Sequence, residues 1–480
     1  MPDAVTGADP DATLWAARAW LPGGWRENVL LRVGADGCWR EISPDVAAPP
    51  AGSTLLAGPV LPGLVDAHSH AFQRAFAGLA EQRESAASDD FWSWRDRMYA
   101  VAGRITPAQL RTVAAQLYVE LLQGGYTQVC EFHYLQHQPD GTPYADPLEL
   151  AWASVDAAGE AGIGLTMLPV LYERAGFAAT TLRPEQRRFA ASADDVWRLA
   201  SSLAASGRPL LRVGLAIHSL RAARPESIEA LQRLARGFAA PIHVHVAEQQ
   251  AEVDDCVAAT GARPIEWLAR EVRLDSRWQL VHATHASAPE IEAVARSGAG
   301  VVLCPSTEAN LGDGLCDLDT WLAAGVPLSI GSDSHVSRAW PEELRLLEYG
   351  QRLALRRRNV AAAPGSGQAS TAARLFERAL AAGGTAAGEP AWGLVAGARA
   401  DALVVDLADA ALIGIGTPRL LDALVFSSPG RPWRDVMVAG RWVVSAHRHA
   451  LADAIAARFA ATMAELWPVG GAATSPEPPR

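Results

Sequence analysis

The sequence contains no lysine, so all 42 of its basic residues are arginine. This absence excludes an enzyme that forms a Schiff base on a lysine, and it excludes the lysine of a nucleotide-binding P-loop. It also excludes a carbamylated lysine that bridges two metal ions. The chemistry of any active site must therefore come from other side chains.

Cysteines and long apolar runs are also scarce. The five cysteines show no CxxC spacing, which argues against a disulfide framework and against a thiolate zinc site. No apolar run approaches the roughly 20 residues that cross a bilayer, and the acidic N-terminal segment lacks the features of a signal peptide. The net charge of -11 and the pI of about 5.6 disfavour nucleic acid and anionic membranes as partners. We therefore expect a cytoplasmic protein.

Short alternating segments separated by glycine turns occur near both ends of the chain. They cover residues 12–21, 29–33, 38–42, 400–407, 423–426 and 436–444. The last of them is typical of a hairpin across Ala439 and Gly440. Neither end can bury a core alone, so we expect residues 1–60 and 391–450 to form one small β-sandwich domain. Residues 451–480 are expected to contain a C-terminal helix and a disordered Pro- and Gly-rich tail.

Between residues 61 and 390 the pattern changes to short apolar runs that alternate with helical stretches. Eight runs are expected to be buried strands, at residues 59–67, 127–132, 164–171, 213–218, 241–246, 279–283, 300–305 and 327–333. The helices expected between them include residues 107–123, 194–205, 227–238, 250–258 and 288–297. Eight such units predict an α/β fold, a (β/α)8 TIM-type barrel, with an insertion at Ala80–Tyr99 after its first strand.

The C-terminal ends of these strands carry the candidate active site, because catalytic residues of such barrels lie there. The first strand ends in His68 and His70, whose spacing of two residues points both rings to the same face. The later strand ends carry His218, His243, His245, His282 and Asp333. Three histidines and one aspartate are a reasonable ligand set for Zn²⁺ or Fe²⁺.

Four motifs resemble the amidohydrolase superfamily, in particular its branch of deaminases with a single metal ion. They are VDAHSH at 65–70, HVHVAE at 243–248, LVHATH at 280–285 and SIGSDS at 329–334. Within that branch, a second set of motifs resembles the formimidoylglutamate deiminases of histidine catabolism. This set comprises AHSHAFQRAFAG at 67–78, FWSWRDRMY at 91–99, EFHYLQH at 131–137 and HSLRA at 218–222.

The resemblance implies a role for each matching residue at the strand ends. The implied metal ligands are His68, His70, His245 and Asp333. It further implies that Glu248 shuttles a proton, that His282 hydrogen-bonds the water on the metal, and that Asp333 also acts as a base. His243 is the alternative to His245 as a ligand, and a packing role beside the metal site is its other interpretation.

The resemblance implies the hydrolytic deamination of N-formimino-L-glutamate. A divalent metal ion lowers the pKa of a bound water to roughly 7, so hydroxide on the metal can attack the formimino carbon at neutral pH. Asp333 takes the proton of the water and Glu248 delivers one to the nitrogen that leaves. The expected products are N-formyl-L-glutamate and ammonia.

Substrate binding is expected to depend on arginine, because a glutamate derivative carries two carboxylates that guanidinium groups hold well. The positions that resemble the family's substrate contacts are Gln73, Arg95, Tyr134, His218 and Arg221. Arg97 is the alternative to Arg95. Phe91, Trp92 and Trp94 either line the pocket or form a local core. The resemblance also implies a homodimer.

Several other interpretations remain open on the sequence. A related deaminase or chlorohydrolase acting on guanine, an adenosine derivative or a triazine would use the same metal site. A binuclear hydrolase would need a carboxylate in place of the bridging lysine, and Glu131 is the candidate. An inactive barrel that serves as an interaction protein is the third alternative. We expect His133, His137, His285 and His335 to support the metal ligands from behind or to lie in loops. His447 and His449 are expected at the surface, outside the barrel.

Overall fold

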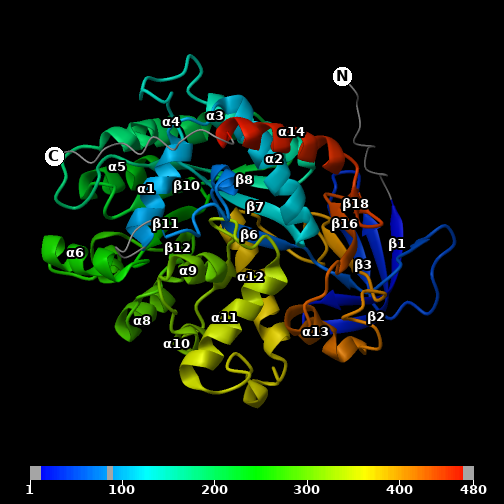
Figure 1. Cartoon of the computed structure of the whole chain (residues 1–480). Coiled ribbons are helices and arrows are strands. Elements are labelled where there is room, and N and C mark those ends of the chain that lie inside the picture. Colours follow the sequence, from blue (N-terminus) through cyan, green and yellow to red (C-terminus); the bar gives the residue numbers. More distant parts are fainter. Residues whose placement is uncertain (1–11, 84–89, 469–480) are drawn as a thin grey trace.

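The computed structural model describes residues 12–83 and 90–468 of the chain. The tail expected to be disordered, residues 470–480, lies outside the described residues, and so does part of the predicted insertion Ala80–Tyr99. Figure 1 shows two parts, a ring of strands surrounded by helices and a sheet of blue and orange strands beside it. Among the described residues, no helix is long and apolar enough to cross a membrane.

Eight parallel strands of the described chain form the barrel, in the order β14-β13-β12-β11-β10-β8-β7-β6. Their bounds are β6 Leu64–Ser69, β7 Tyr126–His133, β8 Gly164–Leu171, β10 Leu215–Ser219, β11 Ile242–Val246, β12 Trp278–His282, β13 Gly300–Leu303 and β14 Leu328–Ile330. The short β9 (Leu211–Val213) pairs with β8 alone. A parallel bridge between Ser69 and Asp333 joins the first strand to the end of the last. The predicted TIM-type barrel is therefore confirmed.

The barrel strands were recognisable because both of their faces are buried. Every residue of β7, β8, β11 and β12 is buried. Strands buried in this way have nearly continuous apolar runs instead of an alternating pattern. The polar residues within such runs, including His68 and His245, therefore stand out as exceptions with a specific role.

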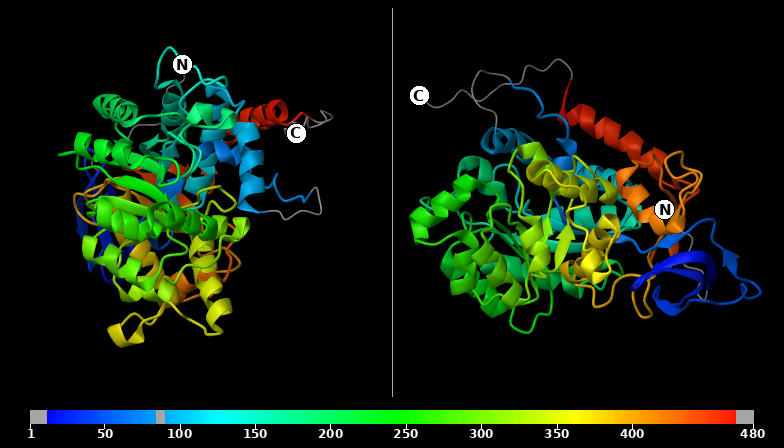
Figure 2. Two further views of the ribbon diagram at one scale, coloured as in Figure 1. Left: turned by 90° about the vertical axis from the view of Figure 1, so that its left-hand side faces the viewer. Right: turned by 90° about the horizontal axis from the view of Figure 1, so that it is seen from below.

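Helices surround the barrel and connect its strands (Figures 1 and 2). They are α1 Phe91–Ala102, α2 Pro107–Gln123, α3 Glu149–Ala161, α4 Ala193–Ala205, α5 Pro225–Leu234, α6 Gln250–Thr260, α7 Pro264–Glu271, α8 Ala288–Ser297, α9 Pro305–Leu311, α10 Leu318–Ala323, α11 Trp340–Leu355 and α12 Thr371–Ala387. Helix α2 begins with a capping box, in which Thr106 accepts from the Gln109 backbone and Pro107 takes the first helical position. Helix α12 packs against both β6 and β14, so it covers the seam where the barrel closes.

The strands of the two chain ends pair in one nine-stranded sheet. Its main path runs β18-β17-β16-β15-β5-β1-β2-β3, and β4 pairs with β1. The bounds are β1 Thr13–Leu21, β2 Gly24–Val33, β3 Trp39–Ser43, β4 Thr54–Leu55, β5 Val60–Leu61, β15 Ala402–Val405, β16 Trp433–Val438, β17 Arg441–Ser445 and β18 Arg448–His449. Strand β5 lies between β1 and β15 and so joins the N-terminal strands to the C-terminal ones. Both chain ends therefore contribute to one small β domain, as predicted.

Near the C-terminal end, the predicted hairpin is confirmed, whereas one predicted strand is a helix. Strands β16 and β17 pair across Ala439 and Gly440, whose φ angles of 48° and 76° suit a tight two-residue turn. Residues 423–426, which we expected to be a strand, instead lie in helix α13 (Leu420–Phe426). A short apolar run fits either structure, and here α13 packs against α11 and α12. Helix α14 (Ala452–Leu466) follows the sheet and packs against α2.

Candidate active site

The four side chains predicted to bind a metal ion meet at the C-terminal ends of the barrel strands, and together they are called the ligand cluster. His68 and His70 come from the end of β6, His245 comes from β11, and Asp333 follows β14. The Nε2 atoms of His68 and His245 are 2.9 Å apart. Asp333 Oδ1 lies 3.5 Å from His68 Nε2 and 3.4 Å from His70 Nε2. All four residues are buried, and the structure thus brings the whole predicted ligand set together.

The donor atoms of this cluster fit a divalent cation. His70 Nδ1 lies 3.1 Å from the Phe132 carbonyl oxygen, which can only accept, so the nitrogen that faces Asp333 is Nε2 with its lone pair. Burial lowers the pKa of His68 to about 3 and that of His245 well below its usual range, so both imidazoles are neutral. Neutral ring nitrogens that converge on a carboxylate repel one another unless a cation lies between them. Nitrogen and oxygen donors of this kind suit Zn²⁺ or Fe²⁺.

A buried polar network fixes the two strands that carry these ligands. Asp66 accepts hydrogen bonds from the Ser332 backbone N–H at 2.8 Å and from its hydroxyl at 2.5 Å, which ties β6 to the segment after β14. Ser332 Oγ also lies 2.9 Å from His335 Nδ1. His335 is therefore a buried neighbour of the ligand cluster that packs behind it, in agreement with one of its two expected roles.

Glu131 takes part in the same packing from strand β7. Its carboxylate accepts from the Ser69 hydroxyl at 2.8 Å and from the Ala71 backbone N–H at 2.7 Å. Glu131 is absent from the groups of possible ligands that the described residues form. Its contacts account for it as a structural carboxyl, so the geometry gives no support to a binuclear site bridged by Glu131.

Glu248 and His282 lie beside the ligand cluster. His282 Nε2 is 3.6 Å from Glu248 Oε1 and 3.8 Å from Asp333 Oδ2. Burial raises the pKa of the Glu248 carboxyl to about 7. Burial lowers the pKa of His282, but the negative charges of Glu248, Glu308 and Asp333 outweigh that effect and raise the pKa to about 10. The pair combines a carboxyl that exchanges protons near neutral pH with a cationic ring.

The backbone around these groups adopts unusual conformations. Positive φ angles occur at His282 (68°), Ala283 (48°), Asp333 (50°) and His335 (65°), none of which is a glycine. Such conformations cost energy and persist only where the surroundings enforce them, and they are frequent at functional sites. The strand ends are thus shaped to aim His282 and Asp333 at a common point.

A cavity opens above the ligand cluster, and all five predicted substrate residues line it. Its walls contain His70, Gln73, Phe91, Trp94, Arg95, Met98, Tyr99, Tyr134, Tyr172, Phe189, His218, Arg221, His245, Glu248, His282, Thr307, Leu311 and Asp333. Gln73 Nε2 donates to the Tyr134 hydroxyl at 3.1 Å, and its buried Oε1 has no hydrogen-bond partner among the described residues. Gln73 therefore offers an acceptor to a bound molecule.

Two guanidinium groups enter this cavity from different elements. Arg95 on α1 stacks over Trp92 at 4.5 Å, and Arg221, which follows β10, stacks over the same ring at 5.3 Å. Within the described part of the chain neither arginine forms an ion pair, and Arg95 Nε and Arg221 Nη1 are buried without a hydrogen-bond partner. Burial and the charge of Arg221 lower the pKa of Arg95. The cavity therefore contains two guanidinium groups without an ion-pair partner in the described chain, and the carboxylates of Glu248 and Glu252 act on Arg221 only at longer range.

The structure also decides between Arg95 and Arg97. Arg97 Nη1 donates to the Ala80 carbonyl at 2.8 Å and does not line the cavity above the ligand cluster. Arg95 lines it, as predicted. Trp92 proves to be more than local core, because its ring holds both guanidinium groups in place.

The remaining histidines lie away from the ligand cluster. His243 Nε2 contacts the Ala386 carbonyl at 2.9 Å, so its ring serves packing below the cluster. His137 Nε2 contacts the Ala190 carbonyl. His449 was expected at the surface, and this was wrong, because it is buried and contacts the Ala161 carbonyl at 2.9 Å. His447 is partly buried beside Asp406.

Sequence reasoning missed two residues near the cavity. Glu308, on α9 directly after β13, lies 3.3 Å from His282 Nδ1. Its place just beyond a barrel strand was a usable signal, because acidic residues there have a raised chance of function. Tyr172 follows β8 and lines the cavity, with its ring 4.4 Å from that of His218.

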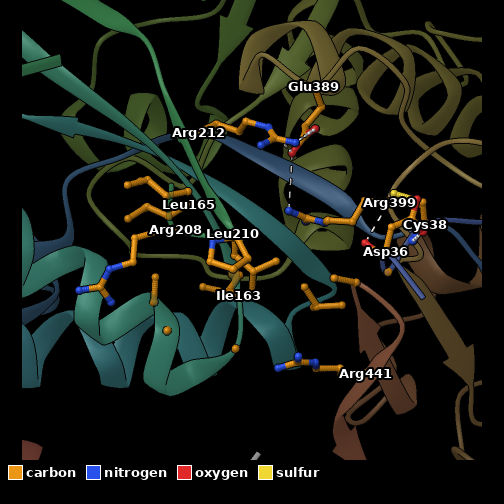
Figure 3. Close-up of a pocket in the computed structure, with 18 of the residues that line it drawn as sticks. Asp36, Cys38, Ile163, Leu165, Arg208, Leu210, Arg212, Glu389, Arg399 and Arg441 are labelled. Atoms are coloured by element: carbon orange, nitrogen blue, oxygen red, sulfur yellow. Dashed lines mark hydrogen bonds and ion pairs between the residues drawn. The ribbon is translucent and has the colours of Figure 1, made fainter. Parts of the chain in front are cut away.

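A second and larger cavity lies at the opposite ends of the strands (Figure 3). Ile163 and Leu165 at the start of β8 contribute to its apolar floor. Arg212 and Arg399 enter it from two sides, and both pair with Glu389, at 3.2 Å and 3.7 Å. The charges of this cavity are therefore largely compensated within the protein.

Comparison with known proteins agrees with this geometry. Residues 60–443 match the family described as "Amidohydrolase family". Formimidoylglutamate deiminase of Pseudomonas aeruginosa is 48% identical over 95% of this chain and 99% of its own length. A 5-methylthioadenosine/S-adenosylhomocysteine deaminase of Natronomonas pharaonis is 30% identical over 80% of this chain and 81% of its own. The crystal structure of an amidohydrolase from Brucella melitensis superposes with a TM-score of 0.88 at 42% identity, over 95% of this chain and 99% of that one.

Proposed function

The chain belongs to the amidohydrolase family, and on that premise we propose that it hydrolyses N-formimino-L-glutamate to N-formyl-L-glutamate and ammonia. The enzyme would be a hydrolase that acts on the C–N bond of a linear amidine. The observation that supports this substrate is the pair of guanidinium groups, Arg95 and Arg221, which line the cavity above the ligand cluster and form no ion pair with a described residue. Two carboxylates on a small substrate match two such groups.

His68, His70, His245 and Asp333 would hold the metal ion, for which we propose Zn²⁺, with Fe²⁺ as the alternative. The three neutral imidazoles and one carboxylate described above support this assignment. When bound, the cation supplies Lewis-acid activation of a water molecule and of the developing oxyanion.

Three side chains would move protons and stabilise charge during the reaction. Asp333 accepts a proton from the water whose oxygen bonds to the formimino carbon. Glu248, whose pKa of about 7 leaves a protonated fraction at neutral pH, donates a proton to the imino nitrogen. The nitrogen, now an amino group on a tetrahedral carbon, takes the proton held by Asp333. As the C–N bond breaks and the C=O double bond forms, the hydroxyl proton returns to Glu248, so ammonia leaves and both carboxyl groups regain their starting states. The cationic His282 ring faces both carboxylates and stabilises negative charge on the oxygen.

The remaining cavity residues would orient the substrate. Arg95 and Arg221 bind its two carboxylates, and their stacking on Trp92 limits the entropy lost when they do so. The free Gln73 Oε1 accepts an N–H of the formimino group. Tyr134 holds Gln73 in place, and His218 lies with its ring 5.1 Å from that of His245, between the metal site and the arginines.

The alternative is a related deaminase or chlorohydrolase that acts on guanine, an adenosine derivative or a triazine. These substrates are aromatic and mostly lack carboxylates, so they would leave both arginines uncompensated in a buried cavity. An inactive scaffold is also disfavoured, because the chain retains the six residues His68, His70, His245, Glu248, His282 and Asp333 in one cluster.

An ammonia-release assay on purified, Zn²⁺-loaded protein tests the proposal. N-formimino-L-glutamate is compared with guanine, 5′-methylthioadenosine and a chlorotriazine, with chloride release measured for the triazine. We expect turnover of N-formimino-L-glutamate in clear preference to the others. Turnover of one of the aromatic substrates alone would refute the proposed substrate and leave the reaction class standing.

Two further assignments are proposed on the resemblance. We propose that the enzyme acts in the cytoplasm as a homodimer, and that the chain divides after residues 60, 390 and 450 into the parts expected from its sequence. Light scattering coupled to size-exclusion chromatography gives the mass in solution. A mass of one 50.8 kDa chain at micromolar concentration would contradict the dimer.

A further inference from the structure

Glu308 is a buried carboxylate on the far side of His282 from the cavity. It lies on α9, is 4% exposed, and places Oε1 3.3 Å from His282 Nδ1. We propose that Glu308 is a positioning residue, which holds the His282 ring with its Nδ1 proton bound and its Nε2 directed at the reacting groups. The inference rests on the proposed function for its catalytic consequence, and on geometry for the positioning itself.

The Glu308 carboxylate is itself fixed by the backbone. The same Oε1 atom accepts the N–H of Cys304, the residue before α9, at 2.9 Å. The Glu308 backbone N–H in turn donates to the Cys304 carbonyl at 2.9 Å. The carboxylate thus hydrogen-bonds to the backbone at the start of its own helix, and its position does not depend on a substrate. A rigidly held acceptor can impose an orientation on its partner.

The rings of His245 and His68 flank His282 at 5.4 Å and 5.9 Å, and Glu308 adds a hydrogen-bond partner to this packing. His282 ends β12 with a φ angle of 68°, followed by Ala283 at 48°, so its backbone is held in the left-handed region. Glu308 is the partner that the described chain provides for Nδ1, whereas Nε2 faces Glu248 at 3.6 Å and Asp333 at 3.8 Å. A carboxylate can only accept, so Nδ1 must carry a proton.

This contact determines which ring nitrogen meets the substrate. With Nδ1–H bound to Glu308, only Nε2 can interact with an oxygen between Glu248 and Asp333. Carboxylates that bind the second nitrogen of active-site histidines fix tautomer and ring orientation in this way.

Metal binding is an alternative role for the residues around Glu308. His282, Cys304 and Glu308 together could hold a metal ion, because their ligand atoms lie within 4.8 Å of one another. Burial raises the pKa of the Cys304 thiol well above its usual range, so this sulfur is protonated and a poor ligand. Glu308 Oε1 is already occupied by two N–H groups. We therefore assign the group to hydrogen bonding, and the count of bound metal ions tests that assignment.

Two substitutions separate the orientation from the charge of Glu308. Glu308→Gln keeps an oxygen acceptor for Nδ1–H and removes the charge, whereas Glu308→Ala removes both. Glu343→Gln is the matched control. Glu343 is a fully buried carboxylate that binds the first turn of α9, through the Ser306 backbone N–H at 2.9 Å and the Ser306 hydroxyl. Within the described chain it forms no hydrogen bond or ion pair with His282.

Steady-state kinetics on N-formimino-L-glutamate give the first readout. We expect Glu308→Ala to lower kcat by about 100-fold and Glu308→Gln by about 10-fold, the range typical for such partners. KM and the content of one metal ion per chain should stay within about two-fold, since neither substrate carboxylates nor ligands are touched. The Glu343→Gln control should keep kcat even where its melting temperature falls. Unchanged kcat in Glu308→Ala, or loss of a second bound metal ion, would overturn the proposal.

A second readout does not depend on turnover. Long-range ¹H–¹⁵N correlation spectra of ring-labelled, Zn²⁺-loaded protein report which nitrogen of each histidine carries a proton, and His282→Gln assigns the His282 signal. We expect a protonated Nδ1 in the wild type and in Glu308→Gln, and a changed signal in Glu308→Ala. The same signal in all three would contradict positioning. If the wild type released no ammonia, the proposed function would fail, while these spectra would still decide the role of Glu308.

Discussion

The arginines of the two cavities at opposite ends of the barrel have different partners. The cavity above the ligand cluster is called the mouth, and the larger cavity at the other ends of the strands is called the underside. At the underside, Arg399 pairs with Asp401 at 2.6 Å and with Glu389, and Arg212 pairs with Glu389 as well (Figure 3). At the mouth, Arg95 and Arg221 meet aromatic rings and have no carboxylate partner in the described residues. Leaving a buried charge uncompensated is costly, so it persists where a ligand supplies the counter-charge.

Size alone would have selected the wrong cavity. The underside cavity is the larger, yet its floor is apolar and its buried charges are balanced within the protein. The mouth is smaller and contains the ligand cluster, a carboxyl with a raised pKa and the two free guanidinium groups. Perturbed and uncompensated groups that share one cavity distinguish a reactive site from a gap between packed elements.

The largest effect is expected when a ligand at the mouth is removed. His245→Ala should abolish metal binding and turnover, a loss beyond the roughly 10–100-fold typical of residues that merely support ligands. His243→Ala, two residues earlier on β11, is the matched control and should keep the metal, because His243 contacts only the Ala386 carbonyl. Metal content by mass spectrometry and ammonia release measure both. Loss of metal in His243→Ala alone would reverse the ligand assignment.

A smaller effect is expected when the proton donor at the mouth is neutralised. Glu248→Gln should keep the metal and lower kcat by about 10²–10⁴-fold, the usual contribution of general acid–base catalysis. The amide fills the same volume but cannot deliver the proton. Turnover and metal content measured on one preparation test this, and near-normal turnover would remove Glu248 from the mechanism.

The comparison of the two cavities is tested most sharply by exchanging one arginine in each. Arg221→Met should raise KM for N-formimino-L-glutamate by about 10–100-fold, because one charged hydrogen-bonded contact contributes about 1.5–3 kcal/mol. Arg441→Met, on the exposed rim of the underside cavity, should change KM less than two-fold. Metal content should be normal in both. An equal change of KM in the two variants would contradict the claim that the substrate binds at the mouth and not at the underside.

The smallest effect on turnover, but a large one on stability, is expected at the underside. Arg399→Met leaves the buried carboxylate of Asp401 without its partner, whereas Glu389 keeps Arg212, and breaking a buried pair costs about 3–5 kcal/mol. Denaturant unfolding should show this loss, while KM of the folded enzyme stays unchanged. A variant with wild-type stability and an altered KM would show that the underside cavity serves the reaction.

The barrel and the meeting of the four proposed ligands were predictable because each depends on local signals. Buried parallel strands produce continuous apolar runs, and residues such as His68 and Asp333 follow those runs directly. Burial of His449 and the contact between Glu308 and His282 were not predictable, since they join segments whose approach depends on tertiary packing. The choice of Arg95 over Arg97 also needed the structure, because the sequence does not say which face of α1 turns toward the cavity.

The central claim is that the mouth selects a substrate by its two negative charges. The direct measurement is kcat/KM of the Zn²⁺-loaded enzyme for N-formimino-L-glutamate and for its diamide, which has the same formimino group but neutral amides in place of both carboxylates. Two charged contacts predict a preference of about 10²–10⁴-fold for the dicarboxylate. Equal values of kcat/KM would show that Arg95 and Arg221 do not recognise carboxylates, and would contradict the claim.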